Sequence, residues 1–222
     1  MITEKQAARV LEVVDAGLSG GLGKPVPGQM CVEAAVCYAF GEPHGDKPSC
    51  VDPVLRTFKI KLNDSDWSSN EARANGMRRL AIAQLGTRGT LDQKLFVSKL
   101  SEMIIRKVLP IALRSVGLEV EAVRCENEGS QEAADVAAAY AAYAAARAAD
   151  AARAAANAAA YAAARAAYAA ADAAADADAD AARAAARAVD KDSILSLAAE
   201  EVVKILIELK TPGSQFLYLT EK

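Results

Sequence analysis

The sequence predicts an all-α protein with two parts, a helical N-terminal body and a long alanine-rich helical arm. Three observations lead to this prediction. Apolar residues recur every three or four positions in several segments before residue 115, as on one face of a helix. From Gln131 to Val189, 39 of 59 residues are alanine, the residue with the highest helix propensity. No glycine or proline occurs between Ser130 and Thr211, so nothing obliges a helix there to end.

Capping residues set the helix boundaries. Thr3 and Gln6 form a capping-box pattern, and Asp52 before Pro53 predicts an N-cap with proline in the first turn. Residues 118–125 alternate loosely between apolar and polar side chains, as in a strand. Because the sequence predicts no second strand to pair with them, we favour a short helix. In chain order, we expect helices over residues 4–18, 29–40, 53–62, 69–86, 91–110 (with Pro110 kinking or ending the helix), 118–125, 131–189 and 193–209. The apolar tail, residues 216–219, is expected to pack back onto the body.

Residues 128–130 are the last flexible point before the arm, so we place a domain boundary between residues 1–129 and 130–222. At about 100° per residue, nearly all non-alanine side chains of the arm lie on one half of the helix. An unbroken helix would be about 90 Å long, so we expect a hairpin or pairing in a dimer. The alanine face would then be covered by residues 193–209 or by a second copy, and we favour a homodimer.

The polar side of the arm is either a partner surface or the solvated stripe of a structural helix. The partner surface would consist of Tyr140, Tyr143, Arg147, Tyr161, Arg165 and Tyr168.

Bulk properties narrow the functional classes. The net charge is −3, which gives no electrostatic reason to expect nucleic acid as a partner. The N-terminus lacks the basic start and apolar run of a signal peptide, and no stretch is apolar enough to span a membrane. The four cysteines are irregularly spaced and are interpreted as reduced thiols. We therefore expect a cytoplasmic protein that does not bind membranes and needs no cofactor.

Residues 28–50 contain the chemically interesting side chains. Cys31 is predicted in the first turn of a helix, where the helix dipole lowers a thiol pKa. His44, the only histidine, and Asp46 follow in the next loop, so a cysteine nucleophile with a His–Asp pair is one hypothesis. The alternative is structural: the cysteines are small buried hydrophobes, and Glu33 and Asp46 hold the loop.

A zinc site is the second hypothesis for this region. It would use Cys31, Cys37, His44 and Cys50, but their spacing matches no common zinc module. Cys31 and Cys37 would also point to different sides of a helix, so we predict no metal.

The glycine-rich stretch before the second helix suggests an anion pocket. It is not a Walker loop, because Pro25 follows Lys24. A glycine-bearing turn into a helix N-terminus can still hold a phosphate-like group. The predicted ligand-binding residues are Lys24, Gly28, Gln29, Met30 and Glu33.

Two motifs carry a resemblance. The chain has MCxEA at residues 30–34 and GEPHxDxPxC at residues 41–50, followed by a helical body and an Ala-Tyr-Arg-rich segment. In these features it resembles a group of bacterial and bacteriophage proteins that has no established activity. The alanine-rich segment also looks like those of bacterial immunity proteins. This resemblance implies a factor that binds and neutralises something rather than a metabolic enzyme.

The function that we expect is non-enzymatic. The chain would be an intracellular binding or regulatory protein, such as a phage counter-defence or immunity-type factor, that captures a protein or a small anionic ligand. The alternative is a cysteine-dependent enzyme that uses Cys31 and His44.

Overall fold

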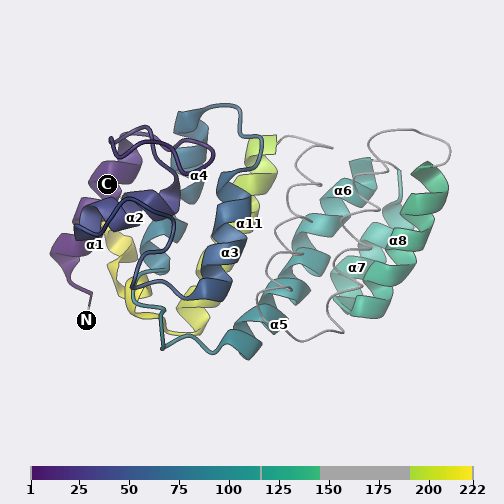
Figure 1. Cartoon of the computed structure of the whole chain (residues 1–222). Coiled ribbons are helices and arrows are strands. Elements are labelled where there is room, and N and C mark those ends of the chain that lie inside the picture. The colour runs from purple at the N-terminus through teal and green to yellow at the C-terminus, as the bar shows by residue number, and fades with distance from the viewer. Residues whose placement is uncertain (1, 116, 146–190, 222) are drawn as a thin grey trace. The chain divides into compact units, whose positions relative to one another are not determined.

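The computed structural model describes residues 2–115, 117–145 and 191–221 (Figure 1). The described residues confirm the all-α class, and their one extended pairing is an isolated bridge between Gly23 and Met30. In chain order the elements are α1 (Glu4–Asp15), α2 (Val32–Phe40), α3 (Pro53–Asn63), α4 (Asn70–Ala83), α5 (Gln93–Met103), the π-helical turn η1 (Ile104–Val108), α6 (Leu109–Ser115), α7 (Glu119–Glu128), α8 (Gln131–Ala145), α11 (Lys191–Glu208) and the 3₁₀ segment η2 (Pro212–Glu221).

The chain forms two compact units. Unit 1 consists of Met1–Phe96 and Ala199–Lys222, and unit 2 consists of Val97–Ala198. These units do not follow the boundary expected at residue 129, because the helices on the two sides of Gly129 pack against each other within unit 2.

Unit 1 packs α1–α4 and the C-terminal segment around one apolar core. α4 contacts both α1 and η2, and α2 contacts α1 and α3. Phe216 and Leu217 of η2 are buried, so the predicted packing of the tail onto the body is confirmed. The fully buried side chains of this core include Val10, Val14, Leu55, Phe58, Met77 and Leu80.

Several helices begin at N-cap residues that the sequence itself indicates. Thr3 and Gln6 form both hydrogen bonds of the capping box, and Ser69 accepts from the Ala72 amide. Asp52 caps α3 ahead of Pro53. These caps satisfy amides that the first turn of a helix leaves without an intrahelical acceptor.

Two helix starts differ from the prediction. α2 begins at Val32 rather than Gln29, because the Gly23–Met30 bridge keeps the chain before Cys31 extended. α5 begins at Gln93 rather than residue 91, because Asp92 caps it, accepting a hydrogen bond of 3.0 Å from the Leu95 amide.

The helical run continues through Pro110, but its hydrogen-bond pattern changes just before this residue. A proline has no amide proton to donate, so the regular hydrogen-bond ladder fails at this position. The chain forms the π-helical turn η1 just before it and continues as α6. The segment at 118–125 is helical, as favoured, and belongs to α7.

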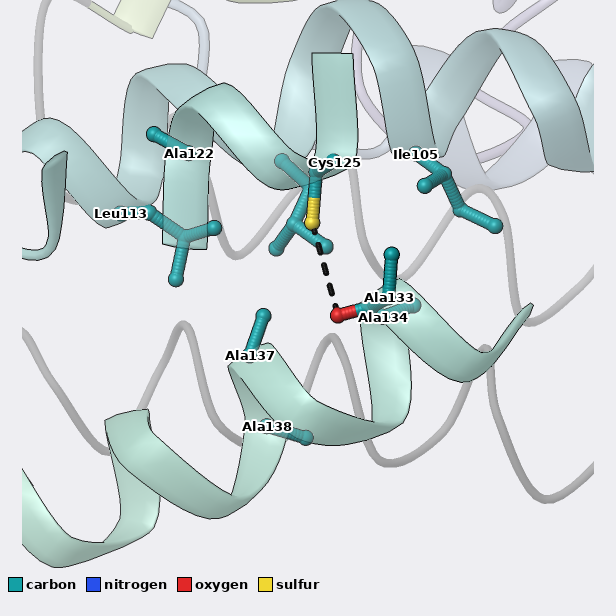
Figure 2. Close-up of a cluster of buried hydrophobic side chains, with 9 residues drawn as sticks. Ile105, Leu113, Ala122, Cys125, Ala133, Ala134, Ala137 and Ala138 are labelled. Atoms are coloured by element: carbon teal, nitrogen blue, oxygen red, sulfur yellow. Dashed lines mark hydrogen bonds between the residues drawn. The ribbon is translucent and has the colours of Figure 1, made fainter. Parts of the chain in front are cut away.

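Unit 2 shows what covers the first part of the alanine face. Ala133, Ala134, Ala137 and Ala138 of α8 pack on a cluster that contains Leu113 of α6 and Cys125 of α7 (Figure 2). The cover expected from residues 193–209 or from a second copy is therefore wrong for this part. The reason is that α6 and α7 already present an apolar surface that small alanines can approach closely. The remaining predictions for the arm, including the hairpin and the dimer, concern residues outside those described.

Candidate functional site

The loop between α1 and α2 has a fixed backbone. The Ser19 amide donates to the Met30 carbonyl at 3.0 Å, and the Lys24 amide donates to the Gln29 carbonyl at 2.7 Å. Gly23 has a φ of 70°, and a Cβ there would lie 2.0 Å from the Gln29 carbonyl oxygen. Only glycine fits this close approach of two backbone strands.

Polar side chains from the end of α3 hold this loop in place. The Asn63 side chain donates to the Ser19 carbonyl at 3.0 Å and accepts from the Val32 amide at 3.1 Å. Asp64 accepts from the Gly21 amide at 2.7 Å. The first amide of α2 is therefore already used by Asn63, which matters for what can bind beside it.

A cavity of about 40 Å³ lies beneath the loop. Its lining runs from exposed residues, Leu22 among them, to fully buried side chains such as that of Glu33. The lining residues are Gly21, Leu22, Cys31, Val32, Glu33, Asp46, Ile60, Asn63 and Asp64. We call this space the acidic cavity, because three carboxylates line it.

Glu33 forms a fully buried ion pair with Lys59 of α3, with 3.1 Å between Oε1 and Nζ. Within the described part of the chain, neither Glu33 oxygen has a hydrogen-bond partner of good geometry, and the same holds for Lys59 Nζ. Burial raises the pKa of Glu33 although Lys59 opposes the shift, and burial lowers the pKa of Lys59. The pair is therefore incompletely satisfied and electrostatically costly.

Cys31 is the N-cap of α2, and its Sγ accepts from the Ala34 amide at 3.3 Å. The expected lowering of its pKa is wrong: burial raises the pKa of Cys31, and the hydrogen bond only partly offsets this. Burial also raises the pKa of Cys37 to about 12 and raises that of Cys50. These thiols remain protonated near neutral pH, a state that is unfavourable for nucleophilic attack.

The structure brings only part of the proposed catalytic set together. Cys31 and Asp46 line the acidic cavity, whereas His44 does not. His44 is exposed, and its Nε2 lies 3.1 Å from the Gly23 carbonyl oxygen, to which it can donate. His44 thus connects the loop before α3 to the loop before α2.

The predicted anion-binding residues do not share one site either. Glu33 lines the acidic cavity, and Lys24, Gly28, Gln29 and Met30 do not. The Gln29 amide already donates to the Val26 carbonyl at 2.9 Å, and Met30 is buried. The carboxylates of the cavity would repel an anion bound beside them.

Other predicted sites are placed as follows. Tyr140 and Tyr143 belong to α8, and Arg147, Tyr161, Arg165 and Tyr168 lie outside the described residues. Among the residues that the structure describes, no group of three or more His, Cys, Asp or Glu side chains is placed to hold a metal ion.

The residues Lys59, Asn63 and Asp64 belong to this region but were not predicted from the sequence. A signal for Lys59 was present, because it lies four residues after Leu55 and three before Leu62, on the apolar face of its helix. A lysine in that position needs a buried partner. The partner, Glu33, is 26 positions away and could not be identified from spacing alone.

Comparisons with protein-family models, with curated proteins and with solved structures found no match to this chain. Within the described residues, none of the helices has the length and apolar character needed to cross a membrane.

Proposed function

We propose that this chain is a non-enzymatic binding protein that recognises another protein through the surface formed by Leu22, Lys24, Val26 and His44, here called the loop surface. The observation that carries the proposal is that Leu22 and Val26 are 44% and 46% exposed on a loop whose backbone is fixed. Large apolar side chains held in this way favour binding, because little conformational entropy is lost on association.

The acidic cavity supports binding over catalysis. Sites for organic substrates usually have volumes of roughly 300–1,000 Å³. The acidic cavity has about 40 Å³, enough for a single small group. The Cys31 thiol beside it has a raised pKa, which argues against the cysteine-dependent enzyme.

The same region favours a protein over a small anionic ligand. Glu33, Asp46 and Asp64 line the cavity, and Asn63 already occupies the Val32 amide. An anion would therefore meet negative charge where the helix N-terminus would otherwise attract it. A counter-defence or immunity-type factor, the class that the sequence resemblance implies, remains the specific form of binding protein that we propose.

The test is a comparison of surface variants. Tagged full-length chain would be used to capture partners from cells that naturally encode it, with bound proteins quantified by mass spectrometry. Val26→Asp and Leu22→Asp should each lower recovery of the same partner by about tenfold or more, as expected when a central apolar contact is lost. Circular dichroism should show that both variants remain folded.

The matched control is Val120→Asp, which alters an exposed valine of α7 in unit 2 that is 77% exposed. It should leave recovery unchanged. If Val120→Asp abolishes capture and Val26→Asp does not, the binding surface lies on unit 2 and the loop-surface proposal is wrong.

A further inference from the structure

We infer that the acidic cavity binds the ammonium group of a lysine side chain on the protein partner. This inference rests on the proposed function, because the lysine would come from the protein that contacts the loop surface. Leu22 belongs both to the loop surface and to the lining of the cavity, so one partner segment can reach both.

The size of the cavity sets the first limit on its occupant. A cavity needs about 10–15 Å³ of such free volume to hold a water molecule, so the acidic cavity has room for a small group of a few heavy atoms. The cavity of about 40 Å³ can take an ammonium group and the carbon next to it. Because Leu22 is exposed, it can pack against the aliphatic stem of a lysine.

The charges around the cavity favour a cation. Glu33, Asp46 and Asp64 contribute three carboxylates. Lys59 and Arg56 act on Glu33 and oppose the rise of its pKa. Three negative and two positive charges leave one negative charge unbalanced.

The floor of the cavity contains acceptors without donors. The Glu33 side chain is fully buried, and its Oε2 has no hydrogen-bond partner in the described part of the chain. A buried carboxylate oxygen in this condition needs a donor, and water or a cation can supply it. An ammonium group has three donors and no acceptor, which suits a lining that contains three carboxylates.

The described residues offer no metal site in the cavity. Metal ions such as Ca²⁺ and Mg²⁺ draw oxygens to about 2.0–2.6 Å, whereas ammonium nitrogen bonds carboxylates at about 2.7–2.9 Å. No three acidic, cysteine or histidine side chains in the described residues are close enough together for a metal ion.

The experiment is an NMR titration of the ¹⁵N-labelled full-length chain with Nα-acetyl-lysine amide at constant ionic strength. We expect saturable shifts of the Gly21, Leu22 and Val32 amide signals. Nα-acetyl-norleucine amide, which lacks the ammonium, should not produce them. Methylammonium should produce them more weakly, and tetramethylammonium, which has no N–H donor, should not.

Variants assign the effect to the cavity. Asp46→Asn should weaken binding of Nα-acetyl-lysine amide by about tenfold, because the acceptor at this position loses its negative charge. Glu121→Gln in α7 of unit 2 removes one negative charge elsewhere and should leave binding unchanged. Asp46 is half-buried and outside the Glu33–Lys59 pair, so its substitution leaves both members of that pair in place.

Three results would overturn the inference. These are no saturable shift, equal shifts with the norleucine compound, or binding of methylammonium without binding of the lysine compound. The last result would assign the cavity to a free small amine. If the titration fails while Val26→Asp still abolishes capture, the lysine assignment is wrong and the loop-surface proposal stands.

Discussion

At the scale of single residues, the fully buried Glu33–Lys59 pair makes the stability of unit 1 depend on pH. Burial raises the pKa of Glu33 above its ordinary value of 4.5 and lowers that of Lys59 below 10.5. Between 4.5 and its raised pKa, Glu33 holds a proton when folded that it has released when unfolded. The Glu33 contribution to the free energy of unfolding therefore falls as pH rises through that window. The Lys59 contribution has the opposite sign and rises as pH increases toward 10.5.

We predict that Lys59→Met destabilises the protein by about 3–5 kcal/mol near pH 7, because Glu33 is left as an unpaired buried charge. The loss should be clearly smaller near pH 4.5, where protonated Glu33 no longer needs a counterion. Urea unfolding followed by circular dichroism at both pH values measures this. Adding Glu33→Leu should recover most of the loss, since the buried charge is then gone. Equal losses at both pH values would contradict this account.

At the scale of elements, the sequence predicted what depends on neighbouring residues. Thr3 and Asp52 cap their helices as expected because each accepts from an amide two or three residues later. The start of α2 was misplaced because the Gly23–Met30 bridge, rather than local propensity, decides it. The pKa of Cys31 was misjudged for a similar reason: the helix dipole is local, whereas burial depends on the whole fold.

Arg106, a residue distant in sequence, caps the C-terminus of α7. Its guanidinium donates to the carbonyl oxygens of Glu126, Asn127 and Glu128 at 2.6, 2.7 and 2.8 Å. The last carbonyls of a helix have no intrahelical donor, so Arg106 supplies what the helix lacks. Gly129 leaves room for this side chain, because a Cβ there would lie 2.2 Å from Arg106 Nε.

We expect Arg106→Met to lower the free energy of unfolding by about 1.5–3 kcal/mol, the range for hydrogen bonds to a charged donor. The control is Arg124→Met in α7, which removes a surface ion pair with Glu128 and should cost less than about 1 kcal/mol. Urea denaturation of both variants under the same conditions decides between them. Similar losses in the two variants would show that the capping contacts of Arg106 contribute no more than a surface charge.

At the scale of the whole molecule, unit 1 is discontinuous in sequence. Residues 1–96 are completed by residues 199–222, and Thr211 Oγ1 donates to the Ala83 carbonyl at 3.1 Å. The packing of the tail is predictable from the sequence, because its apolar composition requires burial. The way the candidate site joins α2, α3 and the loop before α2 is not, since Glu33, Asp64 and Gly21 share no spacing pattern.

The C-terminal 3₁₀ segment η2 should control access to the buried cysteines of unit 1. Phe216 is 8% exposed and packs in that unit, so Phe216→Ala should destabilise it by about 3–5 kcal/mol. Cys31 and Cys37 are buried with raised pKa values, and they react only when the unit opens. We therefore predict that Phe216→Ala accelerates their labelling by a thiol reagent at least about tenfold.

Cys125 serves as the internal reference, because it lies in unit 2 and Phe216 lies in unit 1. Its labelling rate should rise less than the rates of Cys31 and Cys37. Tyr218→Ala, which alters a 48% exposed neighbour in η2, should change all rates by no more than about twofold. Labelling would be resolved by peptide mass spectrometry over time. If Phe216→Ala accelerates Cys125 as much as Cys31, the C-terminal segment stabilises the whole chain rather than unit 1.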